Sequence, residues 1–588
     1  MRRPHRLLLA LALAAGLPGC HRAADGATAP AASAPAPDTR TAEGRIEQDV
    51  RTLAADDMEG REAGTRGYDK AADYVAGRMQ AIGLAPAGDG GGWFQDVPLL
   101  RAVRVQDGAR LAVVHPDRTV ALRFRDQFLP APNYDDPQAQ VEAPAIFVGY
   151  GVHAPALQHD DFAGLDVRGK VAVLFNGAPE RFDHDRRAYY SATRNKLAAL
   201  AERGAVGAVF VNTARDEARS PWQRSADAWR KPGMRLRGAD GKGLNTFPQL
   251  KVVANVPATA ADLLFDGSGK LSSELFAQAD AGQLKGFALP VTLSLAARTQ
   301  VAPVQSRNVV GRIAGSDAAL AAEHVVYTAH LDHVGIGTPV GGDAIYNGAL
   351  DNALGVAILL ESARELAQAQ PRPRRSLVFV AVTAEEKGLL GSEWFAAHPS
   401  VEGPLVANLN LDMPVLLAPS TDVVPIGVEH STLKGVLDTA AKDIGVALSP
   451  DPFPEEVVFV RSDQYPFIRA GIPAVYLVGG VVSADGKRQP KLANQKFMRE
   501  HYHQPSDEAT LPIAYGDAAR LARLNARIGR LVGDAAQRPA WKAGDFFGET
   551  FGEAAGAPAA AAPAPESRGE DAAGATLPGN APAQAPRP

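Results

Sequence analysis

Two imidazoles and three carboxylates occur in the second half of this sequence in an order that is typical of a site for two metal ions. They are His330, Asp351, Glu386, Asp412 and His503. Imidazole and carboxylate donors without a thiolate are a ligand set that suits zinc. Five donors suffice for two ions if one carboxylate, such as Asp351, places an oxygen on each ion. The sequence therefore predicts a hydrolytic centre with two Zn(II) ions per chain.

The elements that must position these residues are predicted from hydrophobic patterning. Four apolar runs are typical of buried parallel strands: residues 325–327, 377–382, 405–411 and 474–478. His330 and Asp332 follow the first run, and Asp412 follows the third. Glu385 and Glu386 follow the second run. Ligand sites in open α/β sheets lie at the carboxyl ends of the strands, so we expect these side chains to converge.

Helical segments alternate with the predicted strands. They cover residues 353–368, 391–397, 433–444 and 463–470. This alternation predicts an α/β fold with a mixed, mainly parallel sheet covered by helices on both faces. Two further amphipathic helices are predicted over residues 46–53 and 68–82, and Gly83 is expected to end the second.

Residues 127–300 have a different pattern. Short β-rich runs bounded by Gly and Pro occupy residues 145–148, 171–175 and 206–211, and a predicted helix at 195–203 precedes the third run. No cluster of catalytic residue types occurs there. We therefore predict a β-rich insertion at 127–300, which divides a catalytic domain into an N-terminal part (43–126) and a main part (301–540).

Length and composition set the broad class. A chain of 588 residues is too long for one core. The formal net charge of −5 and the lack of a basic block give no signal for nucleic-acid binding. Segments 21–42 and 541–588 are rich in Ala and Pro, and we predict a flexible tether and a disordered tail.

The first twenty residues are typical of a targeting segment. Three arginines precede an apolar run at 7–17 that is too short for a normal membrane span. The run ends in Leu17-Pro18-Gly19-Cys20, which resembles the lipobox of bacterial lipoproteins. Cys20 is the single cysteine of the sequence, and we expect it to be lipidated. The resemblance implies a lipid-anchored protein of the cell envelope, and His21 after the cysteine favours the outer membrane, facing the periplasm.

The motifs around the predicted ligands carry a family resemblance. They are AHLDH (329–333), GALDNALG (348–355), TAEE (383–386), NLDM (410–413) and YHQPSD (502–507). Over about residues 43–535 the chain resembles the co-catalytic di-zinc aminopeptidases related to bacterial leucyl aminopeptidase and glutamate carboxypeptidase (clan MH). The resemblance implies the zinc exopeptidase fold (phosphorylase/hydrolase-like), and it implies that the insertion is a protease-associated domain.

The resemblance also implies how the ligands are shared. His330 and Asp412 would hold one zinc, Glu386 and His503 the other, and Asp351 would bridge them. A cis peptide bond would follow the bridging aspartate.

The resemblance also implies roles for residues that are not metal ligands. Glu385 resembles the general base that handles the proton of the attacking water, and Asp332 would accept a hydrogen bond from the far nitrogen of His330. The hydroxyl of Tyr502 would stabilise the oxyanion. One departure is Gln464, which stands where family members often have histidine, so substrate contacts at that position are in question.

The expected activity is that of an aminopeptidase, in which a metal-bridging hydroxide attacks the first peptide carbonyl. A carboxypeptidase or dipeptidase is the main alternative, but it would need a basic pocket, and no arginine cluster adjoins the motifs. A glutaminyl cyclase-like acyltransferase with one zinc and an inactive binding protein are further alternatives. The complete ligand set argues against both.

Overall fold

The computed structural model describes residues 39–552. Most of the expected targeting segment and tether, including Cys20, and the end of the expected tail therefore lie outside the described residues.

A mixed sheet forms the frame of the C-terminal half. Its strands lie in the order β19 (Ala447–Leu448), β18 (Asp422–Ile426), β20 (Ala474–Gly479), β17 (Leu405–Asn410), β13 (His324–His330), β16 (Ser376–Val382) and β12 (Phe287–Ile313). The four predicted strands β13, β16, β17 and β20 are parallel neighbours. β12 and β18 are antiparallel to β16 and β20. The prediction of a mixed, mainly parallel sheet is confirmed.

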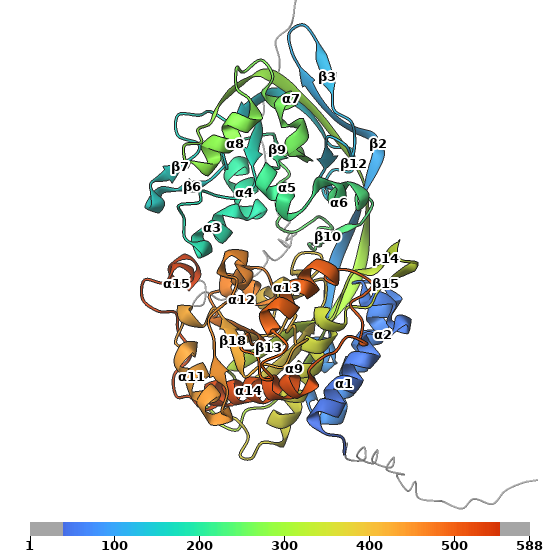
Figure 1. The fold of residues 1–588 in the computed structure, drawn as a ribbon, viewed down its shortest axis with the longest axis vertical. Helices are drawn as coiled ribbons and strands as arrows, with labels where there is room; N and C mark the ends of the chain where they lie inside the picture. The colour runs from blue at the N-terminus through green and yellow to red at the C-terminus, as the bar shows by residue number, and fades with distance from the viewer. Residues whose placement is uncertain (1–38, 553–588) are drawn as a thin grey trace, which may run out of the picture. The chain divides into compact units, whose positions relative to one another are not determined.

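Helices cover both faces of this sheet. Successive residues of β13 point to opposite faces, and they belong to two different apolar cores. Val325 and Tyr327 belong to one apolar core, whereas Val326 belongs to another core with Phe395 and Phe467. The first core is covered by α1 (Ala42–Leu53), α2 (Arg66–Ile82), α9 (Leu354–Gln368), α11 (Leu433–Ile444) and α14 (Tyr515–Asp534). The second is covered by α10 (Leu390–Ala397) and α12 (Gln464–Arg469). Figure 1 shows α9 and α14 against the strands.

The middle region has apolar cores of its own. β5 (Gln140–Phe147), β8 (Val171–Phe175), β9 (Gly207–Val211) and β11 (Val252–Val256) form its sheet, and α4 (Thr193–Glu202) precedes β9. The fully buried rings of Phe147 and Phe175 pack edge to face with a centroid separation of 4.9 Å. The short strands expected here are confirmed.

Two long strands join this region to the sheet of the C-terminal half. β2 (Phe94–Val114) and β12 pair antiparallel over most of their length (Figure 1). β12 pairs with β5 at one end and with β16 at the other. The expected boundary between residues 300 and 301 therefore falls inside one continuous strand, and the assignment of separate domains stays a prediction.

The tail expected to be disordered from residue 541 is partly ordered, so that prediction is wrong for its first residues. Asp545 is the N-cap of helix α15 (Phe546–Phe551), and its carboxylate accepts hydrogen bonds from the amides of Phe547 and Gly548. Phe547 is fully buried against Phe459. Burial of aromatic surface stabilises this short helix despite the Ala- and Pro-rich sequence that follows. Within residues 39–552, no helix has the length and apolarity that crossing a membrane requires.

Candidate metal centre

All five predicted ligands meet at the carboxyl ends of the parallel strands. His330 is the last residue of β13, Glu386 follows the end of β16, and Asp412 follows the end of β17. Asp351 lies in a π-helical turn, Ala349–Ala353, directly before α9. His503 lies in the loop between α13 (Pro490–Glu500) and α14. The expected convergence is confirmed.

One cluster consists of His330, Asp412 and Asp351. The Nε2 atom of His330 lies 2.9 Å from Oδ1 of Asp412 and 3.3 Å from Oδ1 of Asp351. All three side chains are buried. Three donors with room for a fourth ligand are typical of a catalytic zinc site.

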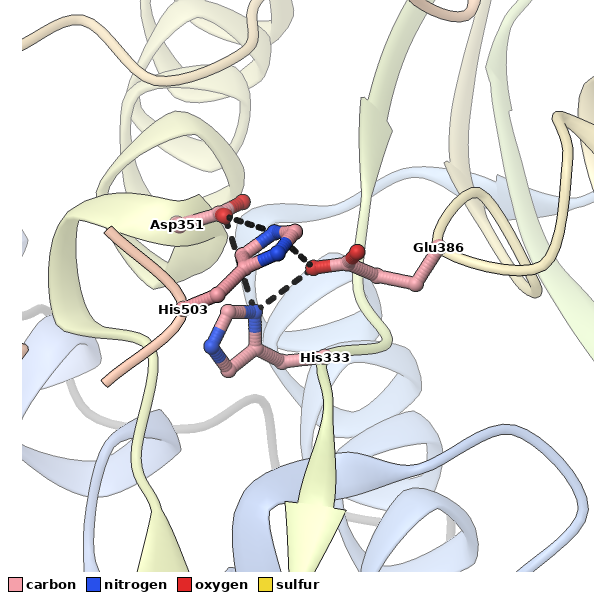
Figure 2. Close-up of side chains that lie close together, drawn as sticks. All are labelled: His333, Asp351, Glu386 and His503. Carbon is pink, nitrogen blue, oxygen red and sulfur yellow. Dashed lines mark ion pairs between the residues drawn. The ribbon is translucent and has the colours of Figure 1, made fainter. Parts of the chain in front are cut away.

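A second cluster contains Asp351, Glu386 and His503 (Figure 2). Nε2 of His503 lies 3.2 Å from Oδ2 of Asp351 and 3.1 Å from Oε1 of Glu386. The two oxygens of Asp351 thus face different clusters: Oδ1 faces His330 and Oδ2 faces His503. This is the geometry expected of a bridging carboxylate.

Sequence reasoning missed one member of the second cluster, His333. Its Nδ1 lies 2.9 Å from Oε1 of Glu386 and 3.7 Å from Oδ2 of Asp351, and its ring is fully buried. Figure 2 shows the ring directed at the same point as the ring of His503. The sequence contains a signal for this residue, because His333 is the last residue of the AHLDH motif that also contains His330. It was missed because the residue lies beyond the end of β13, where no strand periodicity predicts its direction.

The backbone of the bridging aspartate is held by buried side chains. Asp507 accepts hydrogen bonds from the amides of Leu350 and Asp351, at 3.0 and 3.1 Å. Asn352 donates to the carbonyl of Leu411. The expected cis peptide bond between Asp351 and Asn352 is present. The turn that carries the bridge is therefore tied both to the loop of His503 and to the end of β17.

Asp332 does not make the contact that was expected. Nδ1 of His330 lies 3.0 Å from the backbone carbonyl oxygen of Asp332, and the carboxylate points elsewhere. Its two oxygens accept the amides of Glu385 and Glu386, at 3.0 and 3.3 Å. The chain turns back after β13, so the carbonyl rather than the side chain reaches the imidazole. Asp332 therefore positions the two glutamates, while its backbone fixes the tautomer of His330.

A chain of hydrogen bonds holds Asp412. Oγ of Ser462 donates to Oδ2 of Asp412 at 2.6 Å and accepts from Nδ2 of Asn410 at 3.0 Å. The same amide group of Asn410 also donates to Oε1 of Gln464. Gln464 is fully buried and donates to the carbonyl of Phe459. Gln464 therefore supports Asn410 from inside the protein and is not part of the wall of the cavity beside the site.

The side chain of Arg61 connects the loops that follow β13 and precede the turn of Asp351. Its guanidinium is fully buried and donates to the carbonyls of Leu331, Asn347 and Gly348, at 2.6–2.9 Å. Burial lowers the pKa of Arg61 to about 10, against the attraction of acidic groups that include Asp507. At neutral pH it still carries a positive charge, which lies beside the buried carboxylates.

Pairing decides the charge states in the second cluster. Burial and the neighbouring Asp351 would raise the pKa of Glu386, but contacts with His333 and His503 lower it to about 2. Burial would lower the pKa of His503, but Asp351 and Glu386 raise it to about 10. The carboxylates of Asp351 and Glu386 are therefore ionised, and nearby positive charge stabilises their ionised form.

A cavity of about 580 Å³ opens over the first cluster. Its wall includes His330, Asp351, Asp412, Glu385 and Tyr502. Burial, followed by the carboxylates of Asp412 and Glu386, raises the pKa of Glu385 well above its usual value. Burial and the nearby carboxylates also raise the pKa of Tyr502, which keeps its phenol protonated as a hydrogen-bond donor. The ring of Tyr502 stacks on His503 at 3.8 Å.

The donor set fits zinc on structural grounds. Oδ2 of Asp351, Oε1 of Glu386 and both ring nitrogens of His333 are buried without a hydrogen-bond partner of normal geometry. Buried polar groups in folded proteins are almost always partnered. Of these atoms, Nδ1 of His333 lies near Oδ2 of Asp351 and Oε1 of Glu386, so a divalent cation between them would give these three donors a partner.

Comparison with known proteins agrees with this site. Residues 308–528 match the profile of Peptidase family M28. A "Glutamate carboxypeptidase 2 homolog" of Caenorhabditis elegans is 24% identical over 58% of this chain and 46% of its own length. A "Probable zinc metalloprotease" of Leptosphaeria maculans is 27% identical over 39% of this chain and 56% of its own. This chain spans about half the length of the curated relatives it matches.

Among solved structures, an aminopeptidase from Aneurinibacillus sp. strain AM-1 has a TM-score of 0.49 and 18% identity, with 83% of this chain and 93% of that chain covered.

Replacing Asp332 with Asn should weaken metal binding. An amide offers one acceptor oxygen where the carboxylate offers two, so the amide of Glu385 or Glu386 loses its partner and the glutamate loops loosen. Loss of such supports typically costs about 10–100-fold in metal affinity or activity. Competition with a chelator measures the affinity.

Asp161→Asn is the matched control, because one oxygen of buried Asp161 accepts the amides of Tyr150 and Val152 in the middle region. It should leave metal affinity unchanged. Equal metal affinity in Asp332→Asn and the unmodified chain would contradict the positioning role.

Proposed function

We propose that this chain, whose residues 308–528 match Peptidase family M28, is a zinc-dependent exopeptidase and specifically an aminopeptidase that removes N-terminal residues from peptides. The observation that carries the proposal is the pair of donor clusters that share Asp351, one of which lies in the wall of a cavity beside Glu385. Two zinc ions per chain are proposed, one at each cluster.

The side chains around the cavity have distinct tasks. When bound, zinc polarises the scissile carbonyl and lowers the pKa of the attacking water. Glu385 takes the proton of that water and passes it to the leaving nitrogen. The raised pKa of its carboxyl is consistent with a group that holds a proton between the two transfers. Tyr502, a protonated phenol at the cavity wall, donates to the developing oxyanion.

The charges around the cavity favour recognition of an α-amino group. The carboxylates of Glu385 and Asp412 face it and can accept hydrogen bonds from an ammonium group. Cationic side chains also line the cavity, but two of them already bind carboxylates: Arg461 contacts Glu456 at 3.2 Å and Arg499 contacts Glu500 at 2.8 Å. The third, Lys491, donates to the carbonyl of Pro452 at 3.3 Å. Recognition of a C-terminal carboxylate would fall to Lys491 or would need one of these two pairs to open.

A carboxypeptidase is the second candidate. Arg461 at the cavity wall could serve it if the ion pair with Glu456 exchanged for a substrate carboxylate. The relative from Caenorhabditis elegans is named a homologue of glutamate carboxypeptidase 2, which also supports this candidate.

Two further proposals concern the rest of the chain. The middle region is proposed to be a protease-associated domain, on the support of its own apolar cores and short strands. The protein is proposed to be an exported lipoprotein, anchored through Cys20 to the outer membrane and facing the periplasm, on the support of the lipobox-like sequence Leu17-Pro18-Gly19-Cys20.

A panel of matched peptides tests the direction of cleavage. Peptides with a free N-terminus should release their first residue, and N-acetylated copies should resist because the blocked amine carries no charge for the carboxylates to bind. C-amidated copies should be cleaved normally. Mass spectrometry of the products identifies the released residue, and loss of C-terminal residues from the acetylated peptides would establish the carboxypeptidase instead.

Glu385→Gln should lower turnover by about 100- to 10,000-fold, the range typical of a lost proton-transfer group. Zinc content should stay at two ions per chain, because Glu385 belongs to neither donor cluster. Elemental analysis and initial rates measure the two quantities. Glu365→Gln, a half-buried glutamate on α9, is the control and should keep full turnover. Near-normal turnover in Glu385→Gln would remove the proposed role.

Cys20→Ser should move the protein from the membrane fraction to the soluble fraction, because a serine side chain cannot accept the thioether-linked lipid. Fractionation of cells that express the full chain, followed by immunoblotting, measures the shift. Unchanged membrane association would count against the lipid anchor and leave the proposed peptidase activity untouched.

A further inference from the structure

We propose that His333 is a sixth protein ligand, so that one metal position has four protein donors and the other has three. The four-donor position consists of His333, Asp351, Glu386 and His503, and the three-donor position consists of His330, Asp351 and Asp412. This inference rests on the proposed two-zinc function and assigns different tasks to the two ions.

The separations between donor atoms support four-coordinate zinc. With bond lengths of about 2.0–2.1 Å to nitrogen and oxygen, the donor atoms of a tetrahedral site lie about 3.3–3.4 Å apart. Nδ1 of His333 lies 2.9 Å from Oε1 of Glu386 and 3.7 Å from Oδ2 of Asp351. Nε2 of His503 lies 3.1 and 3.2 Å from the same two oxygens. The four separations lie on both sides of the tetrahedral value (Figure 2).

The surroundings of His333 give it no other evident task. The ring is fully buried, and neither nitrogen has a hydrogen-bond partner of normal geometry. Its backbone amide donates to the carbonyl of Arg61, which fixes the loop behind the ring. A buried imidazole without a partner is costly unless something satisfies it. A cation between His333 and the two carboxylates would satisfy Nδ1 and both unpartnered oxygens together.

The cavity distinguishes the two positions. Its wall includes all three donors of the three-donor position, His330, Asp351 and Asp412. Of the four-donor position, the wall includes the shared Asp351 and His503, whereas His333 and Glu386 lie outside it. Sites closed by four protein donors are typically structural, whereas sites with three keep a position open for water or substrate. The His333 position therefore holds its ion tightly, and the His330 position is the one that exchanges ligands with the cavity.

Zinc retention measures this difference directly. The purified full chain is loaded with zinc and dialysed against increasing chelator, and bound zinc is counted by elemental analysis. The unmodified chain should lose one zinc well before the other. His333→Gln should lose this tightly held ion, with affinity lower by about 100-fold or more, a larger effect than the 10–100-fold typical of lost ligand supports.

Two further variants separate coordination from packing. His333→Cys offers a thiolate, a good zinc ligand, and should recover most of the retention that His333→Gln and His333→Asn lose. Cobalt substituted for zinc should give the strong visible absorption of a four-coordinate ion in the unmodified chain and a weaker band in His333→Gln. His324→Gln is the control, because His324 is a buried histidine at the opposite end of β13 that contacts the carbonyl of Glu402. It should retain zinc normally.

The outcomes separate this inference from the proposed function. If His333→Gln retains zinc as the unmodified chain does, or if the Cys, Gln and Asn variants behave alike, His333 is not a ligand, and a two-zinc peptidase can stand without it. If the unmodified chain binds no zinc, the proposed function fails together with this inference.

Discussion

Mutual repulsion among buried carboxylates is the constraint on which the rest of this structure depends. Asp351, Glu386 and Asp412 lie together at the edge of a sheet, and ionised groups that are removed from water need positive charge close by. Imidazoles contact each of them, and the guanidinium of Arg61 adds a fixed charge behind the loops. These positive neighbours do not satisfy every atom of the cluster. Oδ2 of Asp351 and Oε1 of Glu386 still lack a hydrogen-bond partner of normal geometry. A divalent cation would give these atoms a partner.

Such a cluster requires a rigid backbone around it, because a shift of one carboxylate would change its distance to every charged neighbour. The protein provides this rigidity by tying the loops to one another. Asp507 holds the turn of the bridging Asp351, Asp332 holds the two glutamates, and Ser462 holds Asp412. Each support comes from a different part of the chain. The parallel strands bring the loops together, and these hydrogen bonds then fix their relative positions.

The fold divides the environment of the metal centre into two sides. On one side the donors of the three-donor cluster line the cavity with Glu385 and Tyr502. On the other side His333 and Glu386 lie outside the cavity wall, and the amide of His333 donates to the carbonyl of Arg61, whereas His503 of the same cluster also lines the cavity. One shared carboxylate, that of Asp351, connects the two. The two donor clusters therefore differ in how far they face the cavity.

Sequence by itself determined the five candidate ligands and the candidate base Glu385, and it predicted the helices and strands that carry most of them. Residue type sets donor chemistry, and parallel strands place their carboxyl ends at one edge. It did not predict β2 and β12, because their partners are far apart in the chain and the prolines at 98, 290 and 303 weaken a strand pattern. Tertiary structure alone decided that the carbonyl of Asp332 faces His330 and that His333 enters the second cluster. Both depend on the path of a loop, which is set by long-range contacts and follows no local period.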